Sequence, residues 1–255
     1  MRRRSLRSNS SGQLLIVAAL AIALLISSTT AYVYEVTRET GDTTPLTPID
    51  TFVSVIKLVA KNAVISSLAN VSNGGAANTL TSNLDKLSEA VHELSGFGIC
   101  NLAYTVLNGS GYDSGIKTEW RTSGSGVSTA YVNFTLLLQG EESQITMRFA
   151  VNVTTSIAIS GSCVPLGGGA VNVSLTCRMS NDGHPSSVED LDVFYYDDGA
   201  WIQAGASKSL VVTDYGNGTY CPSFVATLVA PVQVSIRVCD FRGVFVQANA
   251  TCPMQ

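Results

Sequence analysis

The sequence predicts an α+β protein in which a helical hairpin packs on an antiparallel sheet and a β-sandwich follows at the C-terminus. Three observations support this prediction. Apolar residues recur at helical spacing before residue 95, they alternate with polar residues after residue 100, and turn residues separate the later strands as in a sandwich. The 255 residues, 45% hydrophobic and 13% charged, are enough for two packed domains.

The N-terminus has the pattern of an export signal. Arg2, Arg3, Arg4 and Arg7 precede an unbroken apolar run over residues 14–26, and no further charge occurs before Glu35. Positive charge before an apolar segment keeps the N-terminus inside and sends the rest of the chain across the membrane. We therefore expect residues 1–36 to be a leader with a membrane-associated helix, residues 37–47 to be a spacer, and the bulk of the chain to be extracellular.

Two fates of this segment follow from its length and small residues. Residues 13–34 number 22, enough to cross the hydrocarbon layer as a retained anchor, with Tyr32 and Tyr34 at the outer interface. The alternative is a cleaved signal peptide, because Thr29 and Ala31 stand at the −3 and −1 positions of a cleavage site that leaves Tyr32 first.

A third fate comes from a resemblance. The arginine-rich leader, then Ser11, Gly12 and Gln13 directly before an apolar helix, resembles the class III leader of archaeal type IV pilins and pilin-like proteins. That resemblance implies cleavage between Gly12 and Gln13 and a role as a filament subunit. The sequence leaves the three fates open.

Residues 48–163 are expected to form the α+β domain. Its first helix begins at Pro48, is interrupted at residues 72–75, and is followed by a second helix. His92 lies on the polar side of the second helix, so we interpret it as a solvated surface residue. The apolar positions at helical spacing are Phe52, Val55, Ile56, Val59, Ala63 and Leu68, then Leu80, Leu84, Leu87, Val91 and Leu94.

A β-hairpin is predicted around the turn at residues 140–143, because apolar and polar residues alternate on both sides of it. Reflection about the turn pairs Leu138 with Ile145, Leu136 with Met147, Phe134 with Phe149 and Val132 with Val151. Asn133 and Asn152 then point to the opposite, solvent-facing side.

Residues 164–169, with Pro165 and three glycines, are interpreted as a linker to a second domain over residues 170–255. Its strands are expected near residues 171–177, 191–196, 209–213, 220–228, 232–238 and 244–250. Symmetry about Ala230 predicts that the strands on either side of it pair as a hairpin.

Six cysteines on the translocated side predict three disulfides rather than metal or redox chemistry. The hairpin about Ala230 places Cys221 opposite Cys239, and strand parity turns Cys177 and Cys252 inward together. Cys100 and Cys163 are left to close the first β region.

The segment from Asp214 to Cys221, which includes Tyr215 and Tyr220, resembles the strand-entry turn of immunoglobulin-like domains in surface proteins. In those domains a tyrosine after such a turn anchors the corner by its hydroxyl. The resemblance, over residues 170–252, implies an immunoglobulin-like β-sandwich.

N-glycosylation sequons are more frequent than chance predicts in this Ser/Thr-rich chain, which is typical of a surface glycoprotein of an archaeon or a eukaryote. The acceptor candidates are Asn70, Asn108, Asn133, Asn152, Asn172, Asn217 and Asn249.

Catalysis is not expected. His92 and His184 are the only histidines and belong to different domains, and the common nucleophile, metal and phosphate-loop motifs are absent. A net charge of −4 gives no field for nucleic acid, and no cofactor is expected. The acidic pairs fit solvated turns, although a calcium site is an alternative for Asp182, Glu189, Asp190 and Asp197.

Four aromatic residues could bind carbohydrate or protein, or fill the sandwich core: Tyr195, Tyr196, Trp201 and Tyr215. The sequence therefore predicts a membrane-tethered envelope protein that acts in surface structure or adhesion, with other envelope or filament subunits as partners. The alternative is an extracellular carbohydrate- or protein-binding module with no filament role.

Overall fold

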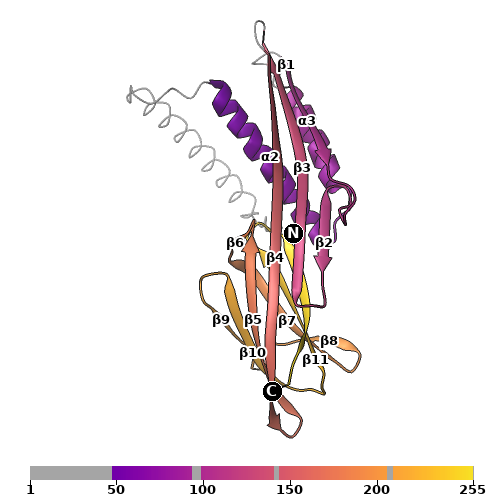
Figure 1. The fold of residues 1–255 in the computed structure, drawn as a ribbon, viewed down its shortest axis with the longest axis vertical. Helices are drawn as coiled ribbons and strands as arrows, with labels where there is room; N and C mark the ends of the chain where they lie inside the picture. Colours follow the sequence, from indigo (N-terminus) through magenta and orange to yellow (C-terminus); the bar gives the residue numbers. More distant parts are fainter. Residues whose placement is uncertain (1–47, 94–98, 141–143, 206–208, 255) are drawn as a thin grey trace, which may run out of the picture. The chain divides into compact units, whose positions relative to one another are not determined.

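The computed structural model describes residues 48–93, 99–140, 144–205 and 209–254 (Figure 1). The predicted leader, its cleavage between Gly12 and Gln13, the membrane segment and the spacer lie outside these residues. The chain divides into two units, residues 1–55 and residues 56–255. The first unit contributes only the start of helix α2 to the described part, and the architecture below is that of the second.

The predicted helical hairpin is confirmed as helices α2 (Pro48–Ser72) and α3 (Thr79–His92). The Nδ2 of Asn83 donates a hydrogen bond of 2.9 Å to Ser67 Oγ and joins the two helices. Val59, expected on the apolar face, is 41% exposed. The buried apolar positions of α2 in the second unit lie four residues apart, at Ile56, Ala60, Val64 and Leu68.

Residues Ile49–Ser72 of α2 are long and apolar enough to cross a membrane by length and composition. In the second unit, however, one side of the helix is buried in the protein. The ammonium of Lys57 lies 5.7 Å from the centre of the Phe149 ring on strand β4, which holds that side of the helix against the sheet. The residues of α2 in the second unit therefore contribute one buried side to the folded core.

The strands form two sheets, and all the pairings within them are antiparallel. The larger has the order β1-β3-β4-β5-β10-β9, with β2 beside β3 and β6 beside β5, and the smaller has the order β12-β11-β7-β8. The strands are β1 (Ile99–Val106), β2 (Ile116–Trp120), β3 (Ser125–Gln139), β4 (Gln144–Gly167), β5 (Ala170–Asn181), β6 (His184–Pro185), β7 (Val188–Asp197), β8 (Ala200–Gln203), β9 (Val211–Asp214), β10 (Thr219–Thr227), β11 (Val232–Asp240) and β12 (Phe245–Cys252).

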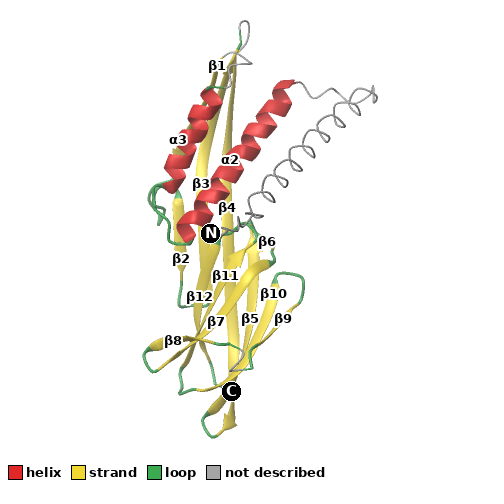
Figure 2. Cartoon of the chain, turned by 180° about the vertical axis from the view of Figure 1, so that it is seen from behind, coloured by secondary structure: helices red, strands yellow, loops and turns green. Residues whose placement is uncertain are grey.

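Strand β4 connects the helical layer to the sandwich. Its 24 residues span about 80 Å at the usual rise of a strand. Figure 2 shows α2 and α3 over the first part of the large sheet, while the smaller sheet covers the part farther along. On β4, Val151 and Val153 are buried first, and Ile157, Ile159 and Cys163 then enter the sandwich core. One continuous sheet therefore serves both cores.

The hairpin predicted around residues 140–143 is confirmed in its register. Strands β3 and β4 pair Leu138 with Ile145 and Phe134 with Phe149, and the two remaining predicted pairs are also present. The Phe134 and Phe149 rings stack with their centres 5.0 Å apart. Strict alternation and a short turn were enough to fix this register, because a shift by one residue would expose the whole apolar face.

Residues 164–169 are not a linker. Strand β4 continues to Gly167, where it pairs with Ala170 at the start of β5, and Gly168 and Gly169 form the turn with positive φ. Pro165 is tolerated in this strand because the pairing of β4 with β3 ends at Ala158. Beyond that point one edge of β4 has no ladder partner on the β3 side, so the missing N–H of proline breaks no β3–β4 bond.

The hairpin predicted about Ala230 is also wrong. Strand β10 pairs with β5 and β9, whereas β11 pairs with β12 and β7 in the other sheet. Phe224 and Ile236 both lie in the sandwich core, so their apolar faces meet across the two sheets instead of side by side. The connection at Ala230 therefore passes from one sheet to the other.

Strand β12 crosses very close to β3. Gly124 N donates to Asn249 O at 2.8 Å, and Ser128 Oγ donates to Phe245 O at 2.7 Å. A Cβ atom on Gly126 would lie 2.0 Å from the carbonyl oxygen of Gln247. Glycine is needed at position 126 because a backbone occupies the space of its side chain.

Candidate functional site

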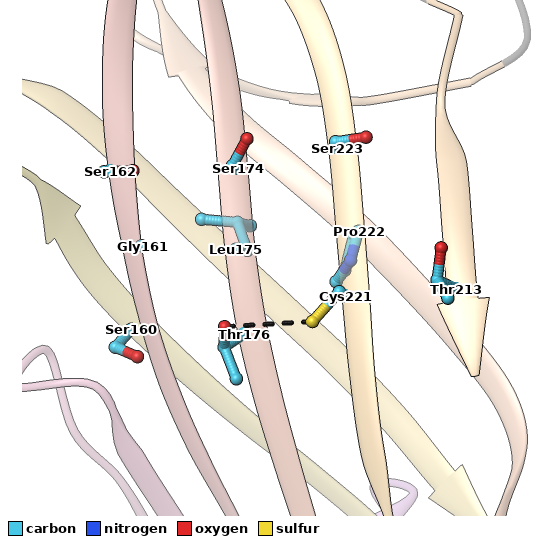
Figure 3. A pocket seen from close by; sticks show the side chains of 10 residues that line it. All are labelled: Ser160, Gly161, Ser162, Ser174, Leu175, Thr176, Thr213, Cys221, Pro222 and Ser223. Atoms are coloured by element: carbon cyan, nitrogen blue, oxygen red, sulfur yellow. Dashed lines mark hydrogen bonds between the residues drawn. The ribbon is translucent and has the colours of Figure 1, made fainter. Parts of the chain in front are cut away.

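The outer face of the large sheet carries a shallow groove of about 480 Å³ lined mainly by hydroxyl groups (Figure 3). Ser160 lies opposite Thr176, and Ser174 lies opposite Ser223. Thr176 Oγ1 and Cys221 Sγ are 3.8 Å apart, as the dashed line in Figure 3 marks. The lining residues are Ser160, Gly161, Ser162, Ser174, Leu175, Thr176, Thr213, Cys221, Pro222 and Ser223.

The groove offers hydrogen bonds but no acid–base pair. None of its ten lining residues is a carboxylate or a histidine. His92 belongs to α3 and His184 to β6, so neither provides a base for the Cys221 thiol. Nucleophilic catalysis has no support in this groove.

The four aromatic residues predicted as one patch are separated. Tyr195 is 2% exposed and stacks on Phe224 in the core, with ring centres 5.6 Å apart. Tyr215 lies after β9, in the other sheet, and is 62% exposed. Only Tyr196 and Trp201 meet at the surface, edge to face at 5.3 Å.

Beside Trp201 lies a second groove of about 300 Å³. Its polar groups come from the outward positions of β11 and β12 and from the turn between β2 and β3: Thr122, Gln233, Asn249 and Thr251, with Ala250 between the last two. An aromatic wall with amide and hydroxyl groups suits a ligand that has both an apolar face and hydroxyls. We call this the Trp201 groove.

The acidic residues that offered an alternative calcium site are not grouped as ligands in the part of the chain that the structure describes. Asp182 is bound by Arg242, whose Nη1 lies 3.0 Å from Asp182 Oδ2, and by the backbone N–H of Thr154 at 2.7 Å. Among the described residues, no group of three or more histidine, cysteine, aspartate or glutamate side chains is placed to hold a metal ion. The carboxylate of Asp182 has a structural role in this arrangement.

A fully buried aspartate, Asp240, stands at the centre of this arrangement. Its Oδ1 accepts hydrogen bonds from the backbone N–H groups of Arg242 and Val244, each at 2.9 Å. Its Oδ2 accepts from Arg242 Nε and Thr155 Oγ1, also at 2.9 Å. Because Thr155 lies on β4 and Asp240 ends β11, this cluster ties the two sheets together. Sequence reasoning missed it.

The predicted disulfide pairs are not brought together, and all six cysteines are free thiols in the structure. Cys100 lies opposite Leu138, which pairs with Ile145. Cys163 is 18 residues farther along β4 than Ile145, or about 60 Å away at the rise of a strand. A bond between Cys100 and Cys163 is therefore excluded by the length of the sheet.

The other two predicted disulfides are not formed, because their cysteines lie on different sheets or are not next to each other. Cys221 points outward from β10 and Cys239 outward from β11, on different sheets. Cys177 lies on β5 opposite Ile159, which is four residues before Cys163 on β4. Burial raises the pKa of the Cys177 thiol to about 12. Cys252 lies near Cys163, not near Cys177: a Cβ atom built on Gly161 would be 3.4 Å from Cys252 Sγ.

None of the seven sequon asparagines is buried. Asn133 and Asn152 are exposed on the open face of the β3–β4 hairpin, as the register predicted. Asn172 and Asn249 are half-buried on β5 and β12. The three remaining acceptor candidates are exposed: Asn70, Asn108 and Asn217.

The tyrosine of the predicted corner makes a hydrogen bond. Tyr220 is buried, and its hydroxyl oxygen accepts a bond of 3.1 Å from the backbone N–H of Val188. In the turn before it, the Asp214 and Asn217 side chains accept bonds from the N–H groups two residues later. The segment between Asp214 and Tyr220 is thus fixed by its own polar residues.

No family model matches the chain, and no curated protein matches it.

Proposed function

We propose that this chain is an exported, membrane-tethered cell-envelope glycoprotein that acts in surface structure or adhesion, as a pilin-like filament subunit. The observation that carries the proposal is the position of the seven sequon asparagines, because none of them is buried in the folded chain. The arginines before the apolar run and the leader around Gly12 and Gln13 supply the route to the surface.

The shared sheet suits such a role. A strand that continues from the helical layer into the sandwich couples two cores through backbone hydrogen bonds, which resists bending between them. The immunoglobulin-like character of residues 170–252 belongs to the same proposal. Its support is the buried Tyr220, whose hydroxyl holds the backbone at Val188.

The test is to locate the chain and read its mature N-terminus. Intact cells that express the full chain are treated with protease, and the protein is mapped for glycopeptides and for its first residue. We expect accessibility at the cell surface, glycans on sequon asparagines, and Gln13 as the first residue. Asn101 is the internal control, because it is exposed on β1 but is not in a sequon.

Each outcome has a distinct meaning. A chain that starts at Tyr32 and is found in the medium overturns the tether, and an intact leader on a surface protein replaces the filament role by a simple anchor. Protection from protease in intact cells, with unmodified asparagines, overturns export itself.

A second function, carbohydrate binding, is favoured by the Trp201 groove. Trp201 is 36% exposed there, and no hydrogen bond within the described protein engages the side chains of Thr122, Gln233 or Thr251. A sugar ring presents an apolar face to an aromatic side chain and hydroxyls to amides, so both kinds of group would be used.

For this function we expect Trp201→Ala to weaken binding to surface polysaccharide fragments by about tenfold or more. Titration calorimetry of the folded protein measures the dissociation constants. Tyr215→Ala is the matched control, because this aromatic residue is more exposed but lies outside the groove. Equal losses in the two variants, or no binding by the unmodified protein, would remove the groove as a binding site.

A further inference from the structure

The end of β12 meets the far end of β4 at two buried cysteines. Cys163 N donates a hydrogen bond of 2.9 Å to Pro253 O, and Cys163 forms an isolated parallel bridge with Met254. Cys163 is 0% exposed and Cys252 is 2% exposed. The backbone contact therefore encloses both side chains.

The two sulfur atoms are close to each other. Gly161 lies two residues before Cys163 on the same face of β4, and a Cβ atom built on it would be 3.4 Å from Cys252 Sγ. The Cys163 and Cys252 thiols lie within hydrogen-bonding reach of one another. Cys163 and Cys177 also share the inner face of two adjacent strands, β4 and β5, but they lie far apart along these strands.

The positions of the other four cysteines in the sheets exclude other disulfide pairings. Cys177 is about 13 Å along β4 from Cys163, judged from its partner Ile159, whereas disulfide Cα atoms lie within about 7 Å. Cys221 is opposite Thr213 on the outer face of one sheet, and Cys239 is on the outer face of the other. Cys100 is on β1, opposite Leu138 at the remote end of β3.

We propose that Cys163 and Cys252 form a disulfide in the exported protein and that the other four cysteines form no intramolecular bond. The inference rests on the proposed export, because the bond needs an oxidising compartment. There the oxidant is a disulfide of a small thiol or of a thiol oxidoreductase. One cysteine thiolate attacks this disulfide and forms a mixed disulfide with one of its sulfur atoms, and the other half leaves as a thiol. The second cysteine thiolate then attacks the mixed disulfide, and the remaining half of the oxidant also leaves as a thiol. The two cysteines lose two electrons and two protons, and the disulfide donor becomes two thiols.

The bond would fasten the C-terminal strand to β4. It closes a loop over residues 163–252, so it restricts the unfolded chain, and its reduction should lower the melting temperature by about 10 °C. Burial raises the pKa of both thiols, so the enclosed pair exchanges slowly with external thiols once the fold has formed.

Peptide mapping of the full chain tests the pairing. Trypsin leaves Cys163 and Cys177 together in residues 149–178 and Cys252 in residues 243–255. We expect these two peptides to be linked in protein from cells and to separate after reduction. Cys163→Ala should abolish the link, while Cys177→Ala, which removes another fully buried cysteine of the same peptide, should retain it.

The same purified variants are then refolded with reduced and oxidised glutathione, and melting is followed with and without reductant. A link that persists in Cys163→Ala, or no link in either sample, overturns the pairing. A link that forms with glutathione but is missing from the cellular protein supports the pairing and overturns the proposed export. If reductant lowers the melting temperature of the unmodified protein and of Cys177→Ala, but not that of Cys163→Ala or Cys252→Ala, the bond stabilises the attachment of the C-terminal strand.

Discussion

Replacement of Asp240 by alanine is expected to lower the free energy of unfolding by about 3–5 kcal/mol, because it breaks a buried ion pair from one side. The Asp240 side chain is 0% exposed, and that of Arg242 is 19% exposed. The substitution leaves the guanidinium without its closest carboxylate and removes the acceptor of two backbone N–H groups and the Thr155 hydroxyl. Urea denaturation of the variant and the unmodified protein measures the difference.

The control is Asp190→Ala, which removes an exposed carboxylate on β7 and should change stability by no more than about 0.5 kcal/mol. Asp240→Asn separates charge from shape, since it keeps an acceptor for the backbone but loses the ion pair with Arg242. We expect it to be intermediate. A loss below about 1 kcal/mol in Asp240→Ala would show that this cluster does not hold the two sheets together.

Local patterns predicted the helices and the β3–β4 hairpin because each is stabilised by neighbours in the sequence. The turn at residues 140–143 is short, and the large apolar residues on either side of it, from Val132 to Leu138 and from Ile145 to Val151, alternate onto one face almost without exception, which leaves a single register. The same reasoning turned Asn133 and Asn152 to the solvent side. Both the α+β class and this face of the molecule could therefore be predicted from the sequence.

The failures occur where alternation alone does not choose the partner strand. The strands around Ala230 each have one apolar face, which fits a hairpin in one sheet and also a crossing between two sheets. At Gly167, Gly168 and Gly169, a cluster of glycines fits a linker or a tight turn equally well. Tertiary packing decided both cases.

The site was predicted least well because its parts are remote in sequence. Asp240 meets Thr155 across 85 positions, and Trp201 shares its groove with Thr122 and Thr251. A weak local signal for the cluster existed, since Asp240 precedes a turn with Arg242 and Gly243. The aromatic patch failed for a simpler reason: adjacent strand residues such as Tyr195 and Tyr196 point to opposite faces.

Replacement of Gly126 by alanine is expected to lower the free energy of unfolding by about 3 kcal/mol or more. The φ of Gly126 is not in the left-handed region, so the effect comes from contact and not from backbone strain. The added Cβ would lie 2.0 Å from the Gln247 carbonyl oxygen and 3.0 Å from Ile157 Cγ2. Since a backbone oxygen cannot swing away, β12 has to move as a strand.

That movement would also break the bonds of Ser128 to Phe245 and of Gly124 to Asn249, which join β12 to β3. Gly205→Ala is the matched control: no atom lies within 4 Å of its added Cβ and its φ is not positive, so we expect a change within about 0.5 kcal/mol. In the Gly126→Ala variant, we expect the backbone amides of β12 to lose protection from hydrogen exchange before those of the other strands. If Gly126→Ala instead matched Gly205→Ala in stability and exchange, β12 could not lie against β3 as described. The route by which β12 brings Cys252 to Cys163 would then have to be different.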